Sequence, residues 1–286
     1  MSLHYDVLNV AVKPIPSQIP GFEEAVGTAT WPPSTSTLIW DAGGGCVLVD
    51  CLITTAEADG LVEWIKAHSQ TPDLVYVTHP HADHIMGLAT IVAAFPNASP
   101  IALADSIPAM EGQISEAAMQ VWSSFFPNQL PTSPIAPKAM SGTTFPIGKA
   151  VATILPVGNT DTAGSTVVHV PDLNLVVAGD VVYNDTHMWM QGSTPATRAN
   201  WLSALDRVDE LGATTIIAGH RDPNAPDDDA QRQLDACRTY LTTFESALAR
   251  SDSPASLVDD MTNAFPKLAN SYTLWVAAFD LLGPKG

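Results

Sequence analysis

Apolar and polar positions in the first half of the chain predict short buried strands alternating with amphipathic helices. Leu61, Trp64 and Ile65 recur at helical spacing behind Thr54 or Thr55, either of which can cap the helix. Three glycines at 43–45 separate two apolar runs, as in a hairpin of buried strands. The predicted strands cover residues 37–41, 46–50, 73–78 and 101–104, and the predicted helices cover 54–68 and 84–95.

The second half of the chain repeats this order of elements. Trp201, Leu205 and Val208 form one apolar face of a predicted helix. Three aspartates that begin at Asp227 suit the positive end of another helix. The predicted strands cover 151–157, 165–170, 173–178 and 214–218, and the predicted helices cover 195–211, 227–250 and 254–282. The repeated order predicts an α/β fold in which two sheets pack together with helices outside.

Three segments differ from this pattern. Residues 1–33 are rich in proline and glycine and are expected to form an arm packed on the surface. Residues 105–146 begin with a helical pattern over 105–122 and continue into a proline-rich stretch, which is typical of an insertion that caps a site. Residues 227–282 supply C-terminal helices. Because the sequence contains no repeat and no low-complexity linker, we expect a single domain over 1–286.

Composition and charge narrow the range of partners. The chain has 12 basic and 30 acidic residues and a formal net charge of -18, so it would repel nucleic acid and anionic membrane surfaces. Its three cysteines, Cys46, Cys51 and Cys237, lack zinc-type or redox-type spacing and are expected to be buried thiols. Residues 1–20 do not resemble a secretory signal, and no apolar stretch approaches the ~20 residues of a membrane span. We therefore expect a cytoplasmic protein that acts on a small molecule, with a homodimer left open.

The strongest chemical feature is the segment Thr78-His79-Pro80-His81-Ala82-Asp83-His84, which directly follows a predicted buried strand. Alternate residues His79 and His81 can point the same way if the chain is extended there. Asp83 and His84 then turn into the following helix. Imidazole and carboxylate are the ligands that zinc and related divalent metals prefer. This segment therefore predicts a metal site, and it can supply ligands to two adjacent ions.

This segment resembles the His-x-His-x-Asp-His motif of the metallo-β-lactamase superfamily. The resemblance covers the chain from about Ser34 to His220, and more loosely to Arg250. The resemblance implies a four-layer αβ/βα sandwich with a metal site at one edge of its two sheets. Asp180, in Ala178-Gly179-Asp180, is similar to the family's bridging aspartate. His220, in Ala218-Gly219-His220, is similar to its last histidine ligand.

One position departs from the family pattern. The family usually has a histidine in a His-Thr-x-Gly-Ser-like turn, but this chain reads Asp161-Thr162-Ala163-Gly164-Ser165. Asp161 either binds the first metal as a harder, negatively charged ligand or only caps the turn. As a ligand it could lower the Lewis acidity of that metal, favour manganese or iron, or weaken the site.

The resemblance implies two zinc ions, with manganese or iron as alternatives. His79, His81 and Asp161 would hold the first ion, while Asp83, His84 and His220 would hold the second. Asp180 would bridge the two ions, and a metal-bound hydroxide would be the nucleophile. Asp83 would also orient this hydroxide and help to move its proton.

Two further residues are candidates for contact with the substrate. Tyr183 lies three residues after Asp180, where lactone-hydrolysing members of the superfamily place a tyrosine that donates to a substrate oxygen. A core tyrosine on a strand is the other interpretation. His187 could bind substrate or shuttle a proton, or it could be an ordinary surface histidine. An apolar pocket could form under the inserted segment from Trp122, Phe125, Phe126, Met188, Trp189 and Met190.

These features predict a metal-dependent hydrolase that acts on a small ester-like substrate, a lactone or another acyl compound. A β-lactamase is the nearest alternative, although no signal peptide for a periplasmic enzyme is evident. A thioesterase of the glyoxalase type would need basic groups for its anionic substrate, and no clear cluster is present. An iron-dependent sulfur dioxygenase-like role and a non-catalytic binding module with a degraded metal site also remain open. A nuclease of the same fold is disfavoured by the net charge.

Overall fold

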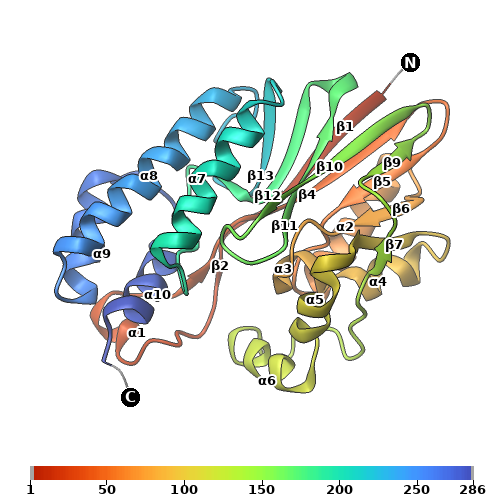
Figure 1. The fold of residues 1–286 in the computed structure, drawn as a ribbon. Helices are drawn as coiled ribbons and strands as arrows, with labels where there is room; N and C mark the ends of the chain where they lie inside the picture. Colours follow the sequence, from red (N-terminus) through yellow and green to blue (C-terminus); the bar gives the residue numbers. More distant parts are fainter. Residues whose placement is uncertain (1–2, 285–286) are drawn as a thin grey trace.

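A single curled sheet organises the protein, and the computed structural model describes residues 3–284 of it (Figure 1). The strands run in the order β8-β7-β6-β5-β4-β13-β12-β11-β10-β9, with β1 paired to β4. One half contains β1 (Leu3–Val10), β4 (Ser34–Asp41), β5 (Cys46–Val49), β6 (Leu74–Tyr76), β7 (Ser99–Leu103) and β8 (Lys138–Met140). The other contains β9 (Thr144–Ile147), β10 (Ala150–Gly158), β11 (Ser165–Val170), β12 (Leu175–Asn184) and β13 (Thr215–Arg221).

The two halves face each other across an apolar layer. Ile39, Val47 and Tyr76 of the first half cluster with Ile154 and Ile217 of the second, and all five are buried. The halves are joined along β4 and β13, where Ser34 pairs with His220. The sheet therefore folds back on itself at a point next to a candidate metal ligand.

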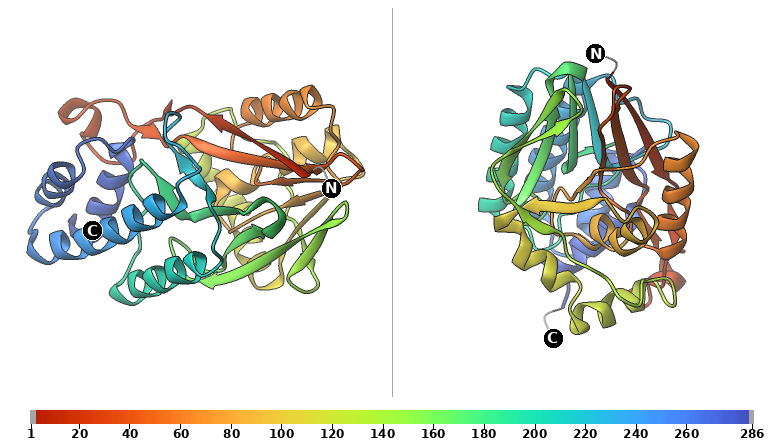
Figure 2. Two further views of the ribbon diagram at one scale, coloured as in Figure 1. Left: turned by 90° about the horizontal axis from the view of Figure 1, so that it is seen from above. Right: turned by 90° about the vertical axis from the view of Figure 1, so that its right-hand side faces the viewer.

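Helices cover the outer face of each half-sheet. On one side lie α2 (Thr55–Ala67) and α4 (Leu88–Ala94), whose Leu61 and Ile91 pack in a cluster with Leu48. On the other side lie α7 (Pro195–Asp209) and α8 (Ala230–Arg250), which bury Trp201 and Leu241. Figure 2 shows α2 and α7 on opposite sides of the strands. This arrangement confirms the predicted αβ/βα sandwich.

Short strands, helices and turns complete the chain outside the main sheet. The small strands β2 (Lys13–Pro14) and β3 (Thr30–Trp31) pair with each other. The remaining helices are α1 (Phe22–Ala25), α3 (Ala82–Ile85), α5 (Ile107–Gln113), α6 (Glu116–Phe125), α9 (Pro254–Ala264) and α10 (Ser271–Leu282), with single 3-10 turns η1 (Ala104–Ser106) and η2 (Pro171–Leu173). None of the described helices is long and apolar enough to cross a bilayer.

Local sequence signals account for several element boundaries. The side chain of Thr54 caps α2 by accepting from Glu57 N, and the Glu57 carboxylate accepts from Thr54 N in return. The helix predicted over 84–95 is two short helices, because the chain turns at Gly87. A Cβ built on Gly87 would lie 2.0 Å from the Cys51 carbonyl oxygen. The helix predicted over 105–122 is also divided, with Ser115 capping α6.

Two segments contribute more to the sheet than their composition suggested. Residues 3–10 of the expected surface arm form β1, which pairs antiparallel with β4. In the expected cap over 105–146, helices α5 and α6 lie outside the sheet. Strand β8 is the first and β9 the last strand in the order of the sheet. The strand predicted over 173–178 extends to Asn184, and all ten of its residues are buried.

We expect Gly87→Ala to destabilise the fold by about 2 kcal/mol or more, because the new methyl group would clash with backbone at Cys51. Urea unfolding of the purified protein would measure this change. The matched control is Gly60→Ala in α2, where no atom lies within 4 Å of a built Cβ. This control should be stabilised by about 0.5–1 kcal/mol. Equal unfolding midpoints for the two variants would contradict the packing described at Gly87.

Candidate metal centre

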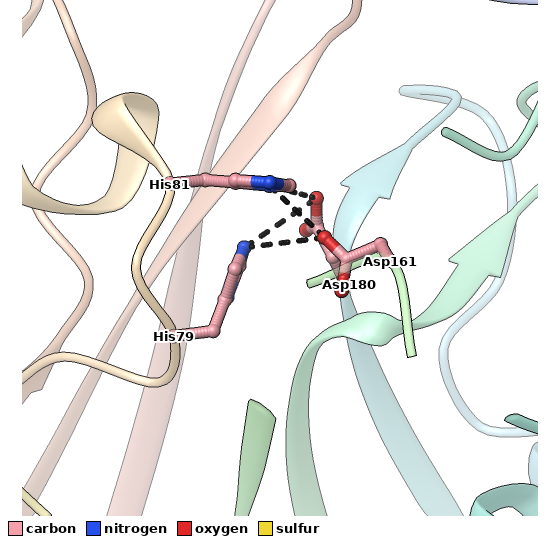
Figure 3. Close-up of side chains that lie close together, drawn as sticks. All are labelled: His79, His81, Asp161 and Asp180. Carbon is pink, nitrogen blue, oxygen red and sulfur yellow. Dashed lines mark ion pairs between the residues drawn. The ribbon is translucent and has the colours of Figure 1, made fainter. Parts of the chain in front are cut away.

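The predicted histidine segment and the later predicted ligands meet at one edge of the two half-sheets. His79 and His81 lie on the loop after β6, while Asp83 and His84 lie in the short helix α3. The other side of the site consists of Asp161 from the β10–β11 loop, Asp180 from β12 and His220 from β13. Figure 3 shows His79 and His81 facing Asp161 and Asp180.

Two glycines make room for the Asp180 carboxylate. Gly179 has a φ of 49°, in the left-handed region, and lies where the pairing of β12 with β13 becomes irregular. A Cβ on Gly219 of the neighbouring strand would lie 2.1 Å from Asp180 Oδ1. The Gly-Asp and Gly-His pairs at these strands therefore let two side chains converge in one small space.

The imidazole nitrogens and carboxylate oxygens that could bind a metal, here called the metal-donor atoms, form two groups. The atoms of each group are close enough to surround one cation. The first group contains His79, His81, Asp161 and Asp180, and the second contains Asp83, His84 and His220. Within each group, the donor atoms all lie within 4.8 Å of one another. All seven ligands predicted from the sequence are thus brought together.

Asp180 lies between the two groups. Its Oδ2 is 3.1 Å from His220 Nε2 and 3.7 Å from His79 Nε2. Oδ2 thus lies between the two groups, while Oδ1, 3.3 Å from His84 Nε2, faces the second group. This geometry allows one carboxylate to contact two neighbouring cations.

Asp161 uses its two oxygens differently. Oδ1 accepts hydrogen bonds from the hydroxyls of Thr160 at 2.9 Å and Ser165 at 3.3 Å. Oδ2 lies 2.9 Å from His81 Nδ1 and 3.7 Å from His79 Nε2. The carboxylate therefore braces its turn with one oxygen and faces the first group with the other.

Several buried donor atoms lack the hydrogen bonds that burial normally requires. Among the described residues, no hydrogen-bond partner is present for His79 Nε2, His84 Nε2, Asp161 Oδ2 and Asp180 Oδ1. All four atoms belong to the two groups. Orphaned imidazole nitrogens and carboxylate oxygens that converge in this way fit divalent cations.

Charge attraction inside the site opposes the cost of burial. Burial alone would raise the pKa of Asp180, but the His220 and His84 imidazoles hold it well below its usual range. Burial likewise opposes charge on His81, yet the carboxylates of Asp161 and Asp180 raise its pKa to about 10. Cations entering this site would therefore meet ionised carboxylates and would displace protons from imidazoles.

Asp50 supports the site but was missed by the sequence analysis. Its Oδ2 lies 2.8 Å from His84 Nδ1 and accepts from Thr78 Oγ1 at 2.8 Å, while Oδ1 accepts from Thr78 N at 2.9 Å. These contacts leave His84 Nε2 facing the site. A carboxylate directly after the apolar strand β5 was the available signal, because such positions lie at the edge of a sheet.

The structure brings Tyr183 into the site. Its hydroxyl donates to Asp180 Oδ2 at 3.0 Å, and its ring lies beside that of His220. Burial and the Asp180 carboxylate raise the pKa of this phenol well above its usual value, so it remains a proton donor.

His187 does not reach the site. Its Nδ1 lies 3.1 Å from the hydroxyl of Tyr240 on α8, and the side chain is buried there. Burial lowers the pKa of His187 to about 4. The structure therefore places this histidine in the core, outside the cavity that opens onto the donor groups.

A cavity of about 220 Å³ opens onto both donor groups. Its lining combines donor residues with aromatic and uncharged polar side chains, namely Trp31, Pro32, His81, Asp83, Gln113, Trp122, Asp180, Tyr183, Trp189, Gln191, His220 and Thr273. Trp122 and Trp189 confirm part of the apolar pocket expected under the inserted segment. Trp31, from the N-terminal segment, was not predicted to contribute.

The sandwich and its paired donor groups fit a metal-binding enzyme, and comparison with known proteins identifies its superfamily, one of metal-dependent hydrolases. The family model of the metallo-beta-lactamase superfamily matches residues 29–220, so the chain belongs to this superfamily. The chain is 31% identical over 80 residues to hydroxyacylglutathione hydrolase 2 from Vibrio vulnificus. That match spans 28% of this chain and 30% of the relative, less than a third of either protein.

Solved structures share the fold over nearly the whole chain. A metallo-beta-lactamase family protein from Thermus thermophilus is 18% identical with a TM-score of 0.62, covering 96% of this chain and 92% of its own. A beta-lactamase domain protein from Burkholderia ambifaria is 14% identical with a TM-score of 0.63, covering 95% and 86%. At this identity the likeness extends to the fold alone.

We expect Asp50→Asn to weaken metal binding by about 10–100-fold, because an amide holds His84 and Thr78 less well than a carboxylate. Competition with a chromogenic chelator would measure the affinity. The matched control is Asp73→Asn, whose Oδ2 instead accepts from Cys46 N at 2.9 Å, at the other end of β5. Unchanged affinity in both variants would contradict the supporting role of Asp50.

Buried His187 should make the protein less stable in acid. Its pKa is lowered on folding, so its neutral form stabilises the protein above pH 6.5, and this contribution is lost as the pH falls toward about 4. The loss by pH 4 should approach about 3 kcal/mol. Urea unfolding between pH 7 and pH 4 should show a shallower decline for His187→Asn than for the unchanged protein. Parallel declines would show that the histidine is not buried as a neutral group.

Proposed function

We propose that the protein hydrolyses a small ester-like bond, in a lactone or another acyl compound, with two divalent metal ions. The observation that carries this proposal is the pair of donor groups sharing Asp180 at the floor of a small cavity. The partial match to a hydroxyacylglutathione hydrolase also supports acyl hydrolysis.

The ligand assignment follows the two donor groups. His79, His81 and Asp161 would hold the first ion, and Asp83, His84 and His220 the second, with Asp180 shared between them. The orientation of Asp161 supports its role as a ligand, because Oδ2 faces the imidazoles while Oδ1 braces the turn. Zinc suits this mixture of nitrogen and oxygen donors, and the additional carboxylate makes manganese or iron acceptable at the first position.

The bound ions would lower the pKa of a coordinated water toward about 7 and polarise the substrate carbonyl. The protein's own side chains supply the remaining functions. The Asp83 carboxylate faces the cavity beside His220, where it can orient the attacking water and accept its proton. Tyr183 retains its phenolic proton, which it donates to Asp180 Oδ2 in the free site. Because the residue lines the cavity, the same hydroxyl can turn from Asp180 to donate this proton to a substrate oxygen.

The alternatives place different demands on the cavity. A glutathione thioester carries carboxylates, and β-lactam antibiotics carry one as well. Both kinds of substrate would bind more tightly if a basic side chain near the metals paired with the carboxylate. Neither lysine nor arginine occurs among the described residues that line this cavity. An iron-dependent dioxygenase-like role is favoured only by the additional carboxylate of Asp161.

We expect purified protein to contain about two divalent ions per chain and to hydrolyse simple lactones or esters. Removing the metal with a chelator should abolish turnover, and adding zinc or manganese should restore it. His81→Ala should lower kcat/KM by more than about a hundredfold, because it removes a donor from the first group. Elemental analysis would measure the metal content. A panel of lactones, esters, thioesters and β-lactams would measure the turnover of each form of the protein.

Tyr183→Phe provides the matched test of the phenol. It removes one hydroxyl and keeps the ring beside His220, so lactone turnover should fall by about tenfold or more at full metal content. Unchanged turnover in this variant would show that Tyr183 does not assist catalysis. A protein without bound metal, or one that cleaves only thioesters or β-lactams, would overturn the proposed function.

A further inference from the structure

Trp31 connects the cavity with a candidate metal ligand. It lies on β3 and is 5% exposed, and its indole Nε1 donates to Asp83 Oδ2 at 3.2 Å. The same carboxylate oxygen lies 3.4 Å from His220 Nε2. The indole N–H thus restricts the orientation of a carboxylate that must present an oxygen to the second ion.

The residues that follow Trp31 extend this support to a second ligand. His220 Nδ1 lies 3.0 Å from the Pro33 carbonyl oxygen, which can only accept a hydrogen bond. The imidazole therefore donates through Nδ1 and directs Nε2 at the site. The short segment 31–33 contacts two of the three residues in the second donor group.

The ring of Trp31 also forms part of an aromatic wall. Its centroid lies 5.9 Å from that of Trp122, with the rings nearly perpendicular, and 6.0 Å from that of Trp189. All three tryptophans line the cavity. The Trp122 indole donates to Gln113 Oε1 at 3.1 Å, so it makes no contact of this kind with a metal ligand.

The charge inside the cavity favours an uncharged ligand. Three carboxylates, from Asp83, Asp161 and Asp180, would nearly balance two divalent cations. The cavity wall outside the donor groups consists of aromatic rings, a proline, two glutamine amides and a few hydroxyls. Such a wall offers neither an ion-pair partner for an anion nor a free carboxylate for a cation, and burying an unpaired charge there is costly.

We propose that Trp31 is both a specificity-determining and a positioning residue, a proposal that rests on the acyl hydrolysis described above. Its ring, with those of Trp122 and Trp189, forms a subsite for an uncharged aryl or branched alkyl group of the substrate. Its N–H fixes Asp83 for the second metal ion. The substrate class is therefore a neutral ester or lactone that carries a compact apolar group.

Trp31→Phe tests the positioning role, because it keeps an aromatic ring and removes the N–H. We expect zinc affinity at the second site, formed by Asp83, His84 and His220, to fall about tenfold in chelator competition, with the affinity of the other site unchanged. Trp122→Phe is the matched control, since its lost N–H serves Gln113, and its zinc affinity should be unchanged. Equal affinities in all three proteins, with unchanged thermal unfolding, would overturn the positioning role. This measurement does not depend on turnover.

A series of para-substituted phenyl acetates tests the subsite once each kcat/KM is divided by the ester's rate of alkaline hydrolysis, because the substituent also changes how readily the phenolate leaves. On this corrected scale, the 4-methyl compound should have a kcat/KM about tenfold higher than the 4-carboxy and 4-trimethylammonio compounds. Trp31→Ala should abolish this preference mainly through KM, while Trp31→Phe should retain it. Equal turnover of charged and neutral esters would overturn the subsite.

A non-hydrolysable probe separates failure of this inference from failure of the proposed function. The amide 4-methylacetanilide is neutral and should quench tryptophan fluorescence on binding, whereas Trp31→Ala should bind it at least about tenfold more weakly. Probe binding without ester hydrolysis would overturn the proposed reaction and leave the apolar subsite supported. Ester hydrolysis together with equal probe binding by the unchanged protein and Trp31→Ala would support the proposed reaction and overturn the apolar subsite.

Discussion

Charge complementarity around the buried Asp180 carboxylate is the constraint on which the rest of the structure depends. An isolated carboxylate cannot be buried cheaply, so it needs cationic or hydrogen-bonding partners from several directions. Here His220, His84 and His79 approach it from three elements, and Tyr183 donates to Oδ2. The left-handed Gly179 and the absence of a side chain at Gly219 allow this convergence. The same unpartnered donor atoms that would destabilise an ordinary core are those that fit two cations.

The position of the site follows from the way in which the sheet folds back on itself. Ser34 and His220 pair where the two half-sheets join, and the loop after β6 approaches from the adjacent half. The N-terminal segment crosses this junction, so that Trp31 and Pro33 contact Asp83 and His220. Residues distant in sequence thereby build both the floor and the wall of one cavity. A change in the wall can therefore alter the metal site as well as substrate preference.

Asp161 changes the electrostatics of the first donor group without disrupting its geometry. In place of a neutral imidazole it brings a second carboxylate to this group, and Asp161 and Asp180 together raise the pKa of His81 to about 10. Hydroxyls of Thr160 and Ser165 hold one of its oxygens, and the other faces the imidazoles. The additional negative charge should strengthen attraction for a hard cation and reduce the acidity of any water bound to it. This substitution distinguishes the chain from the usual pattern of its superfamily.

The sequence by itself determined the superfamily and the sandwich fold, because the ligand motif is local and the element order reflects periodic burial. It also supplied Asp180 and His220, because each follows a predicted strand in the order in which the superfamily places its later ligands. Only the tertiary structure decided which residues support those ligands. Asp50 carried only the signal of a carboxylate after an apolar strand, which does not name its partner. Trp31 carried no signal, and it lies 52 positions from the carboxylate that it contacts. The burial of His187 beside Tyr240 likewise depends on the packing of α8, which no local pattern encodes. Local patterns fix which elements form, whereas the direction of each side chain depends on contacts between elements far apart in the chain.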